Sequence, residues 1–434
     1  MSVNSLMDVV NSFHQKALTE DQREFYQPTA IARDGETIEY HENLFEYINK
    51  SVNNAHILVF GHGGCGKSTE MRMLAGKLRT IGTPSVMVDA LNDLSINDFT
   101  YIDILVLIVK HLTDYIDCSN VKIDKRIISA FKTSLSTTIT SKYWEREATA
   151  SIESDAEVSV AVPFLVKFIT KIAASLKMGS GMKEELRQEI KPQIADVAAT
   201  LNALIENIND INNENNGTGK IVIMIDGLEK CRQECVTKLF TDDVSALKAI
   251  NTHLVVACPI SLYRSPDAAV LMNNFDRADV MPMIKTHNHD LAYSSNRTGI
   301  KVIKHLVLKR VSESFFNKGV LELLIKMSGG NLRDVCYLLK NSAFTAHMRK
   351  KTTIDRSSLM FNADKYATDL FLRIESKYYP TIMEIYKGNH NIRNDKSIPD
   401  LLYAGIVFEY NGERWIDLHP LIRSYIDKQP EAMA

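Results

Sequence analysis

An eight-residue stretch in the first quarter of the chain constrains the fold more than any other feature. Residues 61–68 read Gly-His-Gly-Gly-Cys-Gly-Lys-Ser and satisfy every required position of the pattern G-x-x-x-x-G-K-[ST]. An apolar run over 56–60 precedes the stretch, and a helical pattern over 70–78 follows it. Glycines let such a loop turn its backbone N–H groups toward one anion, and the helix directs the positive end of its dipole at the same place. The stretch therefore predicts a buried strand, a phosphate-binding loop and a helix, in that order.

This loop predicts a site for a nucleoside triphosphate and its magnesium ion. We expect Lys67 to reach the β- and γ-phosphates and Ser68 to coordinate Mg²⁺. No guanine-reading run of the Asn/Thr-Lys-x-Asp type follows the core strands. The residues expected to contact the nucleotide are Gly61, Gly63, Gly64, Cys65, Gly66, Lys67, Ser68 and Thr69.

Length and composition indicate a water-soluble protein of two or three domains. The chain has 434 residues, 45% of them hydrophobic, and a formal net charge of −2, so no global basic field favours nucleic acid or an anionic membrane. The first residues lack the basic and apolar regions of a signal peptide, and the most apolar stretch, 158–176, is interrupted by Pro and Lys. Six cysteines without a CxxC pair fit a reducing compartment, and we expect a cytoplasmic protein without a membrane anchor.

Strand and helix patterns alternate through the first two thirds of the chain. Apolar strand patterns over 85–89, 220–226, 253–258 and 278–283 alternate with helical ones, which predicts a doubly wound parallel α/β sheet. Residues from about 120 to 216 break this alternation and are expected to form a helical insertion. Apolar residues recur there at steps of three and four from Ile190 to Ile208, which favours packing on the protein's own body, with a partner-binding or self-associating surface as the alternative. Cys231 and Cys235 could ligate a metal, but without partners at finger-like spacing they read better as small buried hydrophobes.

The C-terminal third reads as helical, with one hairpin near its end. Residues 299–350 are helical in pattern, and 366–428 contain helices followed by strands over 406–410 and 414–418, joined by Asn411-Gly412. Helices followed by a hairpin predict a winged helix. We therefore expect a lead-in over 1–54, a nucleotide-binding core over 55–290, a helical lid over 291–360 and a winged-helix domain over 361–434.

Two acids follow the strand that ends at residue 226. Asp226 stands where a strand beside the phosphate loop presents a carboxylate to the Mg²⁺ ion, so Ser68 and Asp226 are the expected metal ligands. Glu229 lies three residues on and could orient or deprotonate the attacking water. The alternative for Glu229 is an acid that stabilises a helix N-terminus.

The order of these motifs resembles one branch of the P-loop ATPases. The phosphate loop, Asp-Gly-Leu-Glu over 226–229, the strand ending at Cys258 and Ser-Gly-Gly-Asn-Leu-Arg-Asp over 328–334 look like the AAA+ and STAND branch, which includes NACHT proteins and Orc/Cdc6-like ATPases. The resemblance implies a helical lid and a winged helix after the core. It also implies that Arg333 acts as the lid's sensor of the bound phosphates, for which the forked, permanently charged guanidinium is suited.

This chain departs from ordinary AAA+ motors at two positions. Gly227 stands where those motors place a Glu directly after the strand acid, and Cys258 stands where a polar sensor is usual. Both departures favour slow hydrolysis. An arginine finger from a neighbouring subunit is usual in oligomeric members, and Arg264 and Arg310 are candidates by position only, either of which could be a surface residue.

The sequence thus predicts a slow, Mg²⁺-dependent ATP hydrolase that works as a STAND-like switch. Because the sequence shows no repeat array and no second catalytic constellation, we expect the protein to gate assembly with a separately encoded effector or sensor. Homo-oligomers are possible as well. The resemblance implies anti-phage defence as the biological setting. The alternatives are an Orc/Cdc6-like DNA-binding initiator and a helical scaffold that binds nucleotide without hydrolysing it. Acids match or exceed bases in the expected wing, where Arg414 faces Glu409, Glu413 and Asp417, so we do not expect the winged helix to bind nucleic acid.

Overall fold

A computed structural model describes residues 3–119, 123–134, 158–178, 181–214, 217, 219–290, 293–389, 392, 395–410, 415–429 and 431. Its centre is a five-stranded sheet of β1 (His56–Gly61), β2 (Ser85–Asp89), β3 (Val222–Asp226), β4 (His253–Pro259) and β5 (Arg277–Met281). The strand order is β2-β3-β4-β1-β5, and every neighbouring pair is parallel. The predicted doubly wound parallel sheet is confirmed, with the strand that feeds the phosphate loop held between β4 and β5.

Burial along the strands explains their composition. Every residue of β1, β3 and β4 is buried, whereas the edge strands β2 and β5 are only partly covered. Continuous apolar runs are typical of parallel strands covered on both faces. Strand β5 ends at Met281, earlier than the predicted residue 283, because Pro282 has no N–H for the ladder.

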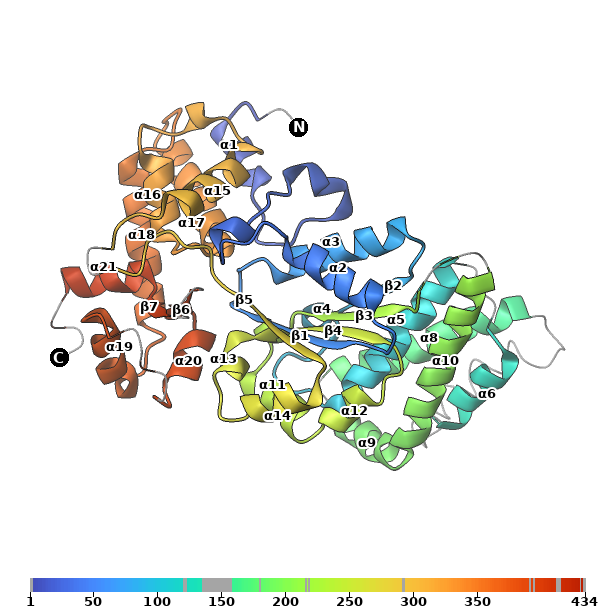
Figure 1. The fold of residues 1–434 in the computed structure, drawn as a ribbon. Coiled ribbons are helices and arrows are strands. Elements are labelled where there is room, and N and C mark those ends of the chain that lie inside the picture. Colours follow the sequence, from blue (N-terminus) through green and yellow to red (C-terminus); the bar gives the residue numbers. More distant parts are fainter. Residues whose placement is uncertain are drawn as a thin grey trace.

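Helices cover both faces of the sheet (Figure 1). On one face lie α2 (Tyr40–Lys50) and α3 (Lys67–Thr80), whose apolar side chains pack with Ile57 and Val59 of β1. Leu58 and Phe60 point the other way, into the larger core that includes α5 (Tyr101–Ser119). The remaining short helices of the core are α4 (Ala90–Asp93), η4 (Leu228–Lys230), α11 (Gln233–Thr241), α12 (Val244–Lys248), α13 (Ile260–Tyr263) and α14 (Ala268–Asn274).

The predicted insertion is a helical layer at one end of the sheet (Figure 1). It comprises α6 (Lys125–Ser134), α8 (Val158–Lys177), α9 (Gly181–Ile190), η3 (Lys191–Gln193) and α10 (Ile194–Glu214). Helix α10 packs against α5 and α6, and the apolar seam is buried apart from the half-buried Ile194. The insertion is anchored by Arg187, whose guanidinium lies 2.8 Å from the buried Asp103 of α5 and 3.0 Å from Asp98. The seam therefore packs on the protein's own body.

The lead-in crosses to the C-terminal half of the molecule (Figure 1). Helix α1 (Leu6–Ser12) packs on α17, and η1 (Glu20–Phe25) and η2 (Ala30–Ala32) follow it. Helix α1 ends at Ser12, because Phe13 is extended, with φ −119° and ψ 105°. The Arg310 guanidinium lies 5.4 Å from the ring centroids of both Phe13 and Phe25. Helix α1 and the rings of Phe13 and Phe25 thus pack against the lid.

The C-terminal third is helical, as expected, and carries the predicted hairpin. Its lid part contains α15 (Arg297–Leu308), η5 (Glu313–Phe315), α16 (Val320–Met327) and α17 (Leu332–Met348). The last part contains α18 (Arg356–Phe371), η6 (Ser376–Tyr378), α19 (Tyr379–Tyr386), α20 (Ile398–Tyr403), β6 (Val407–Glu409), β7 (Ile416–Leu418) and α21 (Pro420–Lys428). Strands β6 and β7 pair antiparallel, and the turn at Asn411-Gly412, with Glu413 and Arg414, lies outside the described residues.

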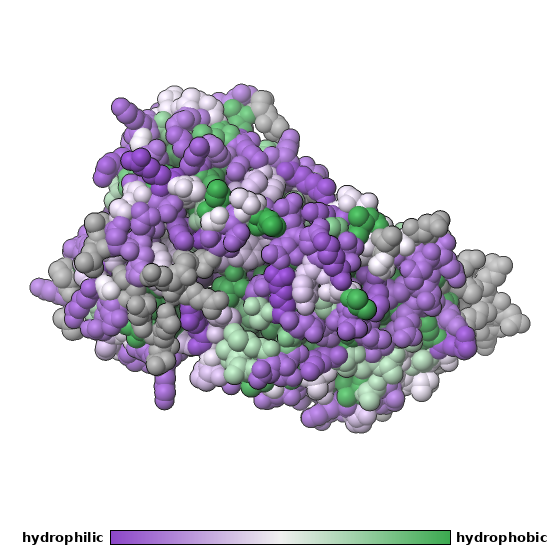
Figure 2. All heavy atoms as spheres, viewed as in Figure 1, coloured by the Kyte–Doolittle hydropathy of each residue, from purple (hydrophilic) through white to green (hydrophobic). Residues whose placement is uncertain are grey.

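Among the described helices none is both long and apolar enough to cross a bilayer. The face drawn in Figure 2 is mostly hydrophilic, with apolar residues in small groups.

Candidate nucleotide site

The phosphate loop has the backbone geometry that anion binding requires. Gly64 and Gly66 adopt left-handed φ values of +90° and +114°, which glycine takes without strain. Within the described part of the chain, the N–H groups of Gly64, Gly66, Lys67 and Ser68 have no acceptor, because α3 begins at Lys67 and leaves its first amides unpaired. Unpaired N–H groups around one loop at a helix N-terminus fit a phosphate group.

Lys67 is folded over the loop that contains it. Its ammonium group donates to the carbonyl oxygens of Gly61, at 2.8 Å, and His62, at 3.0 Å, and its side chain is buried. Because an ammonium group has three donors, one remains for a phosphate oxygen.

Ser68 and Asp226 meet although 158 residues separate them. The Ser68 hydroxyl donates to Asp226 Oδ1 at 2.9 Å, because β3 ends beside the start of α3. Burial, followed by the nearby charge of Glu229, raises the pKa of Asp226. A hydroxyl and a carboxylate are the hard oxygen ligands that Mg²⁺ prefers, so the residues present fit the ion.

Glu229 lies on η4, directly after β3 and the left-handed Gly227. Its side chain is 5% exposed, and its Oε2 is buried without a hydrogen-bond partner among the described residues. An orphaned buried carboxylate oxygen needs a partner such as water. A three-residue 3₁₀ turn offers little dipole, which weakens the alternative of a helix-stabilising acid.

The lid places Arg333 against the phosphate loop. A side chain added at Gly63 would put its Cβ 3.1 Å from Arg333 Nη1. Asn331, which caps α17, donates from Nδ2 to the Gly63 carbonyl at 3.0 Å, and the Leu332 N–H donates to the Gly64 carbonyl at 3.1 Å. The cap and first residue of α17 therefore donate hydrogen bonds to the backbone carbonyls of the phosphate loop.

Two contacts to the loop come from residues that the sequence did not single out. Arg33, buried in the lead-in, donates from its guanidinium to the carbonyl oxygens of Cys65 and Pro282. His62, inside the loop, accepts a hydrogen bond from the Glu409 N–H of β6 at 2.8 Å through its Nε2. Burial, followed by the charge of Lys67, lowers the pKa of His62 to about 3, so the imidazole is neutral. No local pattern marks either residue, because each contact joins distant segments.

The segment that contains α20, β6 and β7, which we call the winged segment, contacts the core at further points. The Glu409 carboxylate lies 2.6 Å from Arg264 Nε, and its carbonyl accepts from the Met283 N–H at 3.3 Å. The Tyr403 hydroxyl of α20 donates to the Cys231 carbonyl, just after η4, at 2.7 Å. Strands and helices of the winged segment thus contact the loops at the carboxyl ends of β1, β3, β4 and β5.

Arg264 and Arg310, the two arginine-finger candidates, are both half-buried and make contacts within the chain. Arg264 is committed to the buried Glu409 carboxylate. Arg310 lies between two phenyl rings, where burial lowers the pKa of its guanidinium. Neither side chain is free to reach a neighbouring subunit in this conformation.

Cys258 and Cys231 lie close to this region as well. Cys258 in β4 is buried, and burial raises the pKa of its thiol, whose Sγ lies 3.7 Å from the Val256 carbonyl. Cys231 is buried in the apolar core, as predicted, whereas Cys235 is only half-buried. Among the described residues no cluster of three or more His, Cys, Asp or Glu side chains could hold a metal ion.

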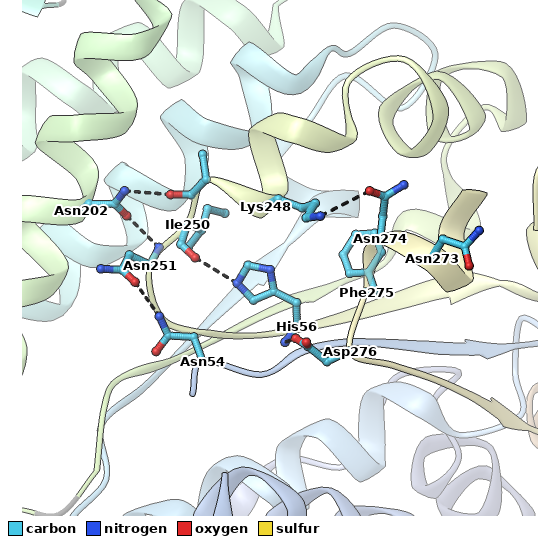
Figure 3. A pocket seen from close by; sticks show the side chains of 11 residues that line it. Asn54, His56, Asn202, Lys248, Ile250, Asn251, Asn273, Asn274, Phe275 and Asp276 are labelled. Carbon is cyan, nitrogen blue, oxygen red and sulfur yellow. Dashed lines mark hydrogen bonds between the residues drawn. The ribbon is translucent and has the colours of Figure 1, made fainter. Parts of the chain in front are cut away.

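A separate cavity of about 570 Å³ opens at the opposite, amino end of the strands (Figure 3). Its amides mostly bond to one another: Asn54 Nδ2 donates to Asn251 Oδ1 at 2.6 Å, and the Asn251 N–H donates to Asn202 Oδ1 at 2.8 Å. His56, the first residue of β1, contacts the Ile250 carbonyl at 2.9 Å. These bonds hold the 249–251 loop to α10 and β1, away from the phosphate loop.

A comparison with family models agrees with the loop geometry. The model of the KAP family P-loop domain matches residues 37–251. No curated protein matches the chain. Similar solved structures include Cdc6p from Pyrobaculum aerophilum, at 10% identity and TM-score 0.39, covering 95% of this chain and 98% of that one. Another is Aeropyrum pernix Orc1 in complex with DNA, at 12% identity and TM-score 0.40, covering 97% of this chain and 96% of that one. A third is the Thermotoga maritima RuvB motor, at 12% identity and TM-score 0.35, covering 89% of this chain and 93% of that one. The family match and the geometry of the loop together identify the chain as a P-loop NTPase.

Proposed function

We propose that this P-loop NTPase is an AAA+ and STAND-like ATPase switch that binds ATP and Mg²⁺, hydrolyses ATP slowly and gates assembly with a separately encoded effector. The observation that carries the proposal is the hydrogen bond between His62 and Glu409. It joins the phosphate loop directly to the winged segment, so rearrangement of the loop around a triphosphate acts on that segment.

The residues of the site have complementary parts in this proposal. The unpaired N–H groups of the loop and the third donor of Lys67 would bind the β- and γ-phosphates. Ser68 and Asp226 would hold Mg²⁺, which when bound neutralises charge on the phosphate oxygens. Glu229 would orient the attacking water with its unpartnered oxygen, and Arg333 would contact the γ-phosphate from the lid.

Slow turnover is supported by the residues at two positions, that of the usual polar sensor and that directly after Asp226. Cys258, at the position of the usual polar sensor, is a buried thiol with a raised pKa and is a weak donor. Gly227 follows Asp226 directly, so the only acid close to Asp226 in the sequence after it is Glu229. Both features favour a long-lived bound state over rapid cycling.

Switching is supported by the number of nucleotide-facing loops that the winged segment contacts. Through Glu409 and Tyr403 it touches the phosphate loop, Arg264 after β4 and the Cys231 carbonyl after η4. A ligand that favours the open state by a few kcal/mol would release all three contacts together. The open state would then expose surfaces for an effector or for another copy of the chain.

The DNA-binding initiator is the weaker alternative. The helix before the hairpin, α20, packs on α13 of the core, and Ile398, Leu401 and Leu402 are buried. A recognition helix must be free to enter a major groove.

Hydrolysis and opening are tested on the same preparations. We expect Lys67→Ala to abolish ATP hydrolysis and Glu229→Gln to lower kcat at least 100-fold while ATP still binds. With a non-hydrolysable ATP analogue, hydrogen exchange of the 407–410 amides should rise in the wild type and stay unchanged in Lys67→Ala. Equal hydrolysis rates for all three proteins would refute the catalytic assignment, and nucleotide binding without any change at 407–410 would refute the switch.

The proposed setting is anti-phage defence, motivated by the resemblance to compact STAND ATPases. Phage plating on cells that carry the chain with its neighbouring genes would test it. Equal plating on wild-type and Lys67→Ala cells would contradict it.

A further inference from the structure

Three large apolar side chains stand out from one face of the lid. Phe344 and Met348, one turn apart on α17, are 47% and 64% exposed, and Phe361 of α18 is 55% exposed. The two helices are held in register by a hydrogen bond of 2.9 Å from Asn362 Nδ2 to Thr345 Oγ1. We call the surface formed by Phe344, Met348 and Phe361 the lid patch.

Arg349 ties the two sides of the lid patch together. It follows Met348 directly, and its guanidinium lies 5.3 Å from the ring centroid of Phe361 and donates to Ser357 of α18 at 3.1 Å. Arg349 thus connects the end of α17, next to Met348, with Phe361 of α18.

The lid patch does not serve the protein's own core. The opposite face of α17 supplies the core with Val335, Leu338, Leu339 and Ala343, all of them buried. Single exposed apolar residues are common on protein surfaces, but a group of three on packed helices indicates a contact with another molecule.

Cations outnumber acids around the lid patch. Residues 334–365 contain six Lys or Arg and three Asp, in a chain whose net charge is −2. Each of the three acids has a partner of its own: Asp334 contacts His419, Asp355 pairs with Lys351 and Asp364 pairs with Lys428. Lys340 lies one turn before Phe344 on α17, Lys365 one turn after Phe361 on α18, and Lys350 beside Met348; none of these three lysines has an ion-pair partner among the described residues.

We propose that the lid patch is the docking surface for an acidic amphipathic helix of a partner protein. The apolar side chains of such a helix would cover Phe344, Met348 and Phe361, and its carboxylates would meet the lysines at both ends of the patch. A helix lying between the ridges of two packed helices is a common mode of recognition. A nucleic acid would need a continuous track of cations, whereas here the apolar side chains occupy the centre.

This inference goes beyond the nucleotide switch and stands separately from it. Phe344 and Met348 lie 11 and 15 residues after Arg333 on the same helix, which is roughly 16 and 22 Å along its axis. Substitutions in the lid patch therefore leave the phosphate loop and its contacts intact.

The test uses the full chain and a fluorescein-labelled 18-residue helical peptide with Leu at i, i+3, i+4 and i+7 and Glu on its other faces. The matched probe replaces every Glu by Lys. Fluorescence anisotropy should show that the acidic peptide binds at least tenfold more tightly than the basic one. The double variant Phe344→Ser/Met348→Ser and the charge variant Lys340→Glu/Lys365→Glu should each weaken binding of the acidic peptide at least tenfold.

The matched control is Val52→Ser, which removes an apolar side chain that is 93% exposed and lies far from the lid in the sequence. It should bind the acidic peptide as the wild type does, and ATP binding should be equal in all variants. Equal binding of the two peptides, or equal binding to wild type and variants, would overturn the proposal. Tighter binding of a 20-nucleotide single-stranded DNA that the same variants abolish would identify a nucleic-acid surface instead. A dimer in mass photometry that the same variants abolish would identify self-association.

Discussion

Acidification should weaken the fold in part through the buried imidazole of the phosphate loop. His62 accepts a hydrogen bond from the Glu409 N–H, and its pKa is lowered from 6.5 to about 3 by burial and by the charge of Lys67. A histidine with this depressed pKa binds fewer protons in the folded than in the unfolded state. Its contribution to the free energy of unfolding is therefore fully present above pH 6.5 and is lost as the pH falls from 6.5 toward 3.

The size of the effect follows from the shift. Each pH unit between the two pKa values removes about 1.4 kcal/mol, so the loss is about 1.4 kcal/mol at pH 5.5 and about 3 kcal/mol at pH 4.5. Protonation also places an N–H on Nε2, where it faces the N–H of Glu409. The contact between loop and winged segment should therefore break before the core unfolds.

Urea denaturation of wild type and His62→Gln at pH 7.5, 6.5, 5.5 and 4.5 measures this loss. The glutamine keeps an acceptor near the Glu409 N–H but does not titrate, and all other groups titrate equally in both proteins. We expect the free energy of unfolding of the wild type to fall more steeply, by the amounts above. Hydrogen exchange of the Glu409 amide, corrected for the intrinsic effect of pH, should rise toward pH 5 only in the wild type. Parallel pH profiles for the two proteins would refute the assignment of a buried neutral imidazole.

Three further substitutions test the contacts around the site and the insertion. Gly64→Ala should weaken binding of a fluorescent ATP analogue at least tenfold, because the new Cβ collides with the cap of α17 and also strains a left-handed residue. Gly35→Ala is the control for strain alone, since Gly35 has φ +84° and open space around it. Equal losses of nucleotide binding in the two variants would contradict the collision. Arg264→Ala should lower the free energy of unfolding by about 3 kcal/mol, because the Glu409 carboxylate stays buried without its cation. Adding Glu409→Gln to this variant should restore part of the loss. Additive losses of the two substitutions in urea denaturation would count against the ion pair. Arg187→Met should cost about 3 kcal/mol by leaving a buried aspartate unpaired and should raise hydrogen exchange in α9; unchanged exchange there would show that the insertion is anchored elsewhere.

The sheet and the start of the site were predictable because their signals are local. The loop pattern over 61–68 specifies a strand before it and a helix after it, and apolar runs mark the other buried strands. The sequence also placed Asp226 at a strand end, and the structure puts it 2.9 Å from Ser68. The resemblance that suggested Arg333 as a phosphate contact led to a side chain that does lie against Gly63.

The remaining contacts could not be predicted because their signals are not local. The bond from Glu409 to His62 spans 347 residues and uses a backbone N–H, which carries no side-chain signature. Arg33, in the lead-in, donates to a backbone carbonyl group of the loop. A backbone carbonyl can accept from any donor, so no sequence pattern identifies this contact. The sequence left Arg264 open as an arginine-finger candidate or a surface residue, because only the folded chain brings the Glu409 carboxylate beside it.

The packing of α1 on α17 has a consequence for biosynthesis. About 320 residues separate the two helices, and a ribosome that adds about 5–20 residues per second needs roughly 16–64 s to make them. During that time Leu6, Val9 and Val10 lack the helix on which α1 packs, so the nascent chain exposes apolar surface of α1 to chaperones until its C-terminal third emerges. Translation from an internal start after Phe25 would yield a chain whose Arg310 lacks both of its aromatic neighbours.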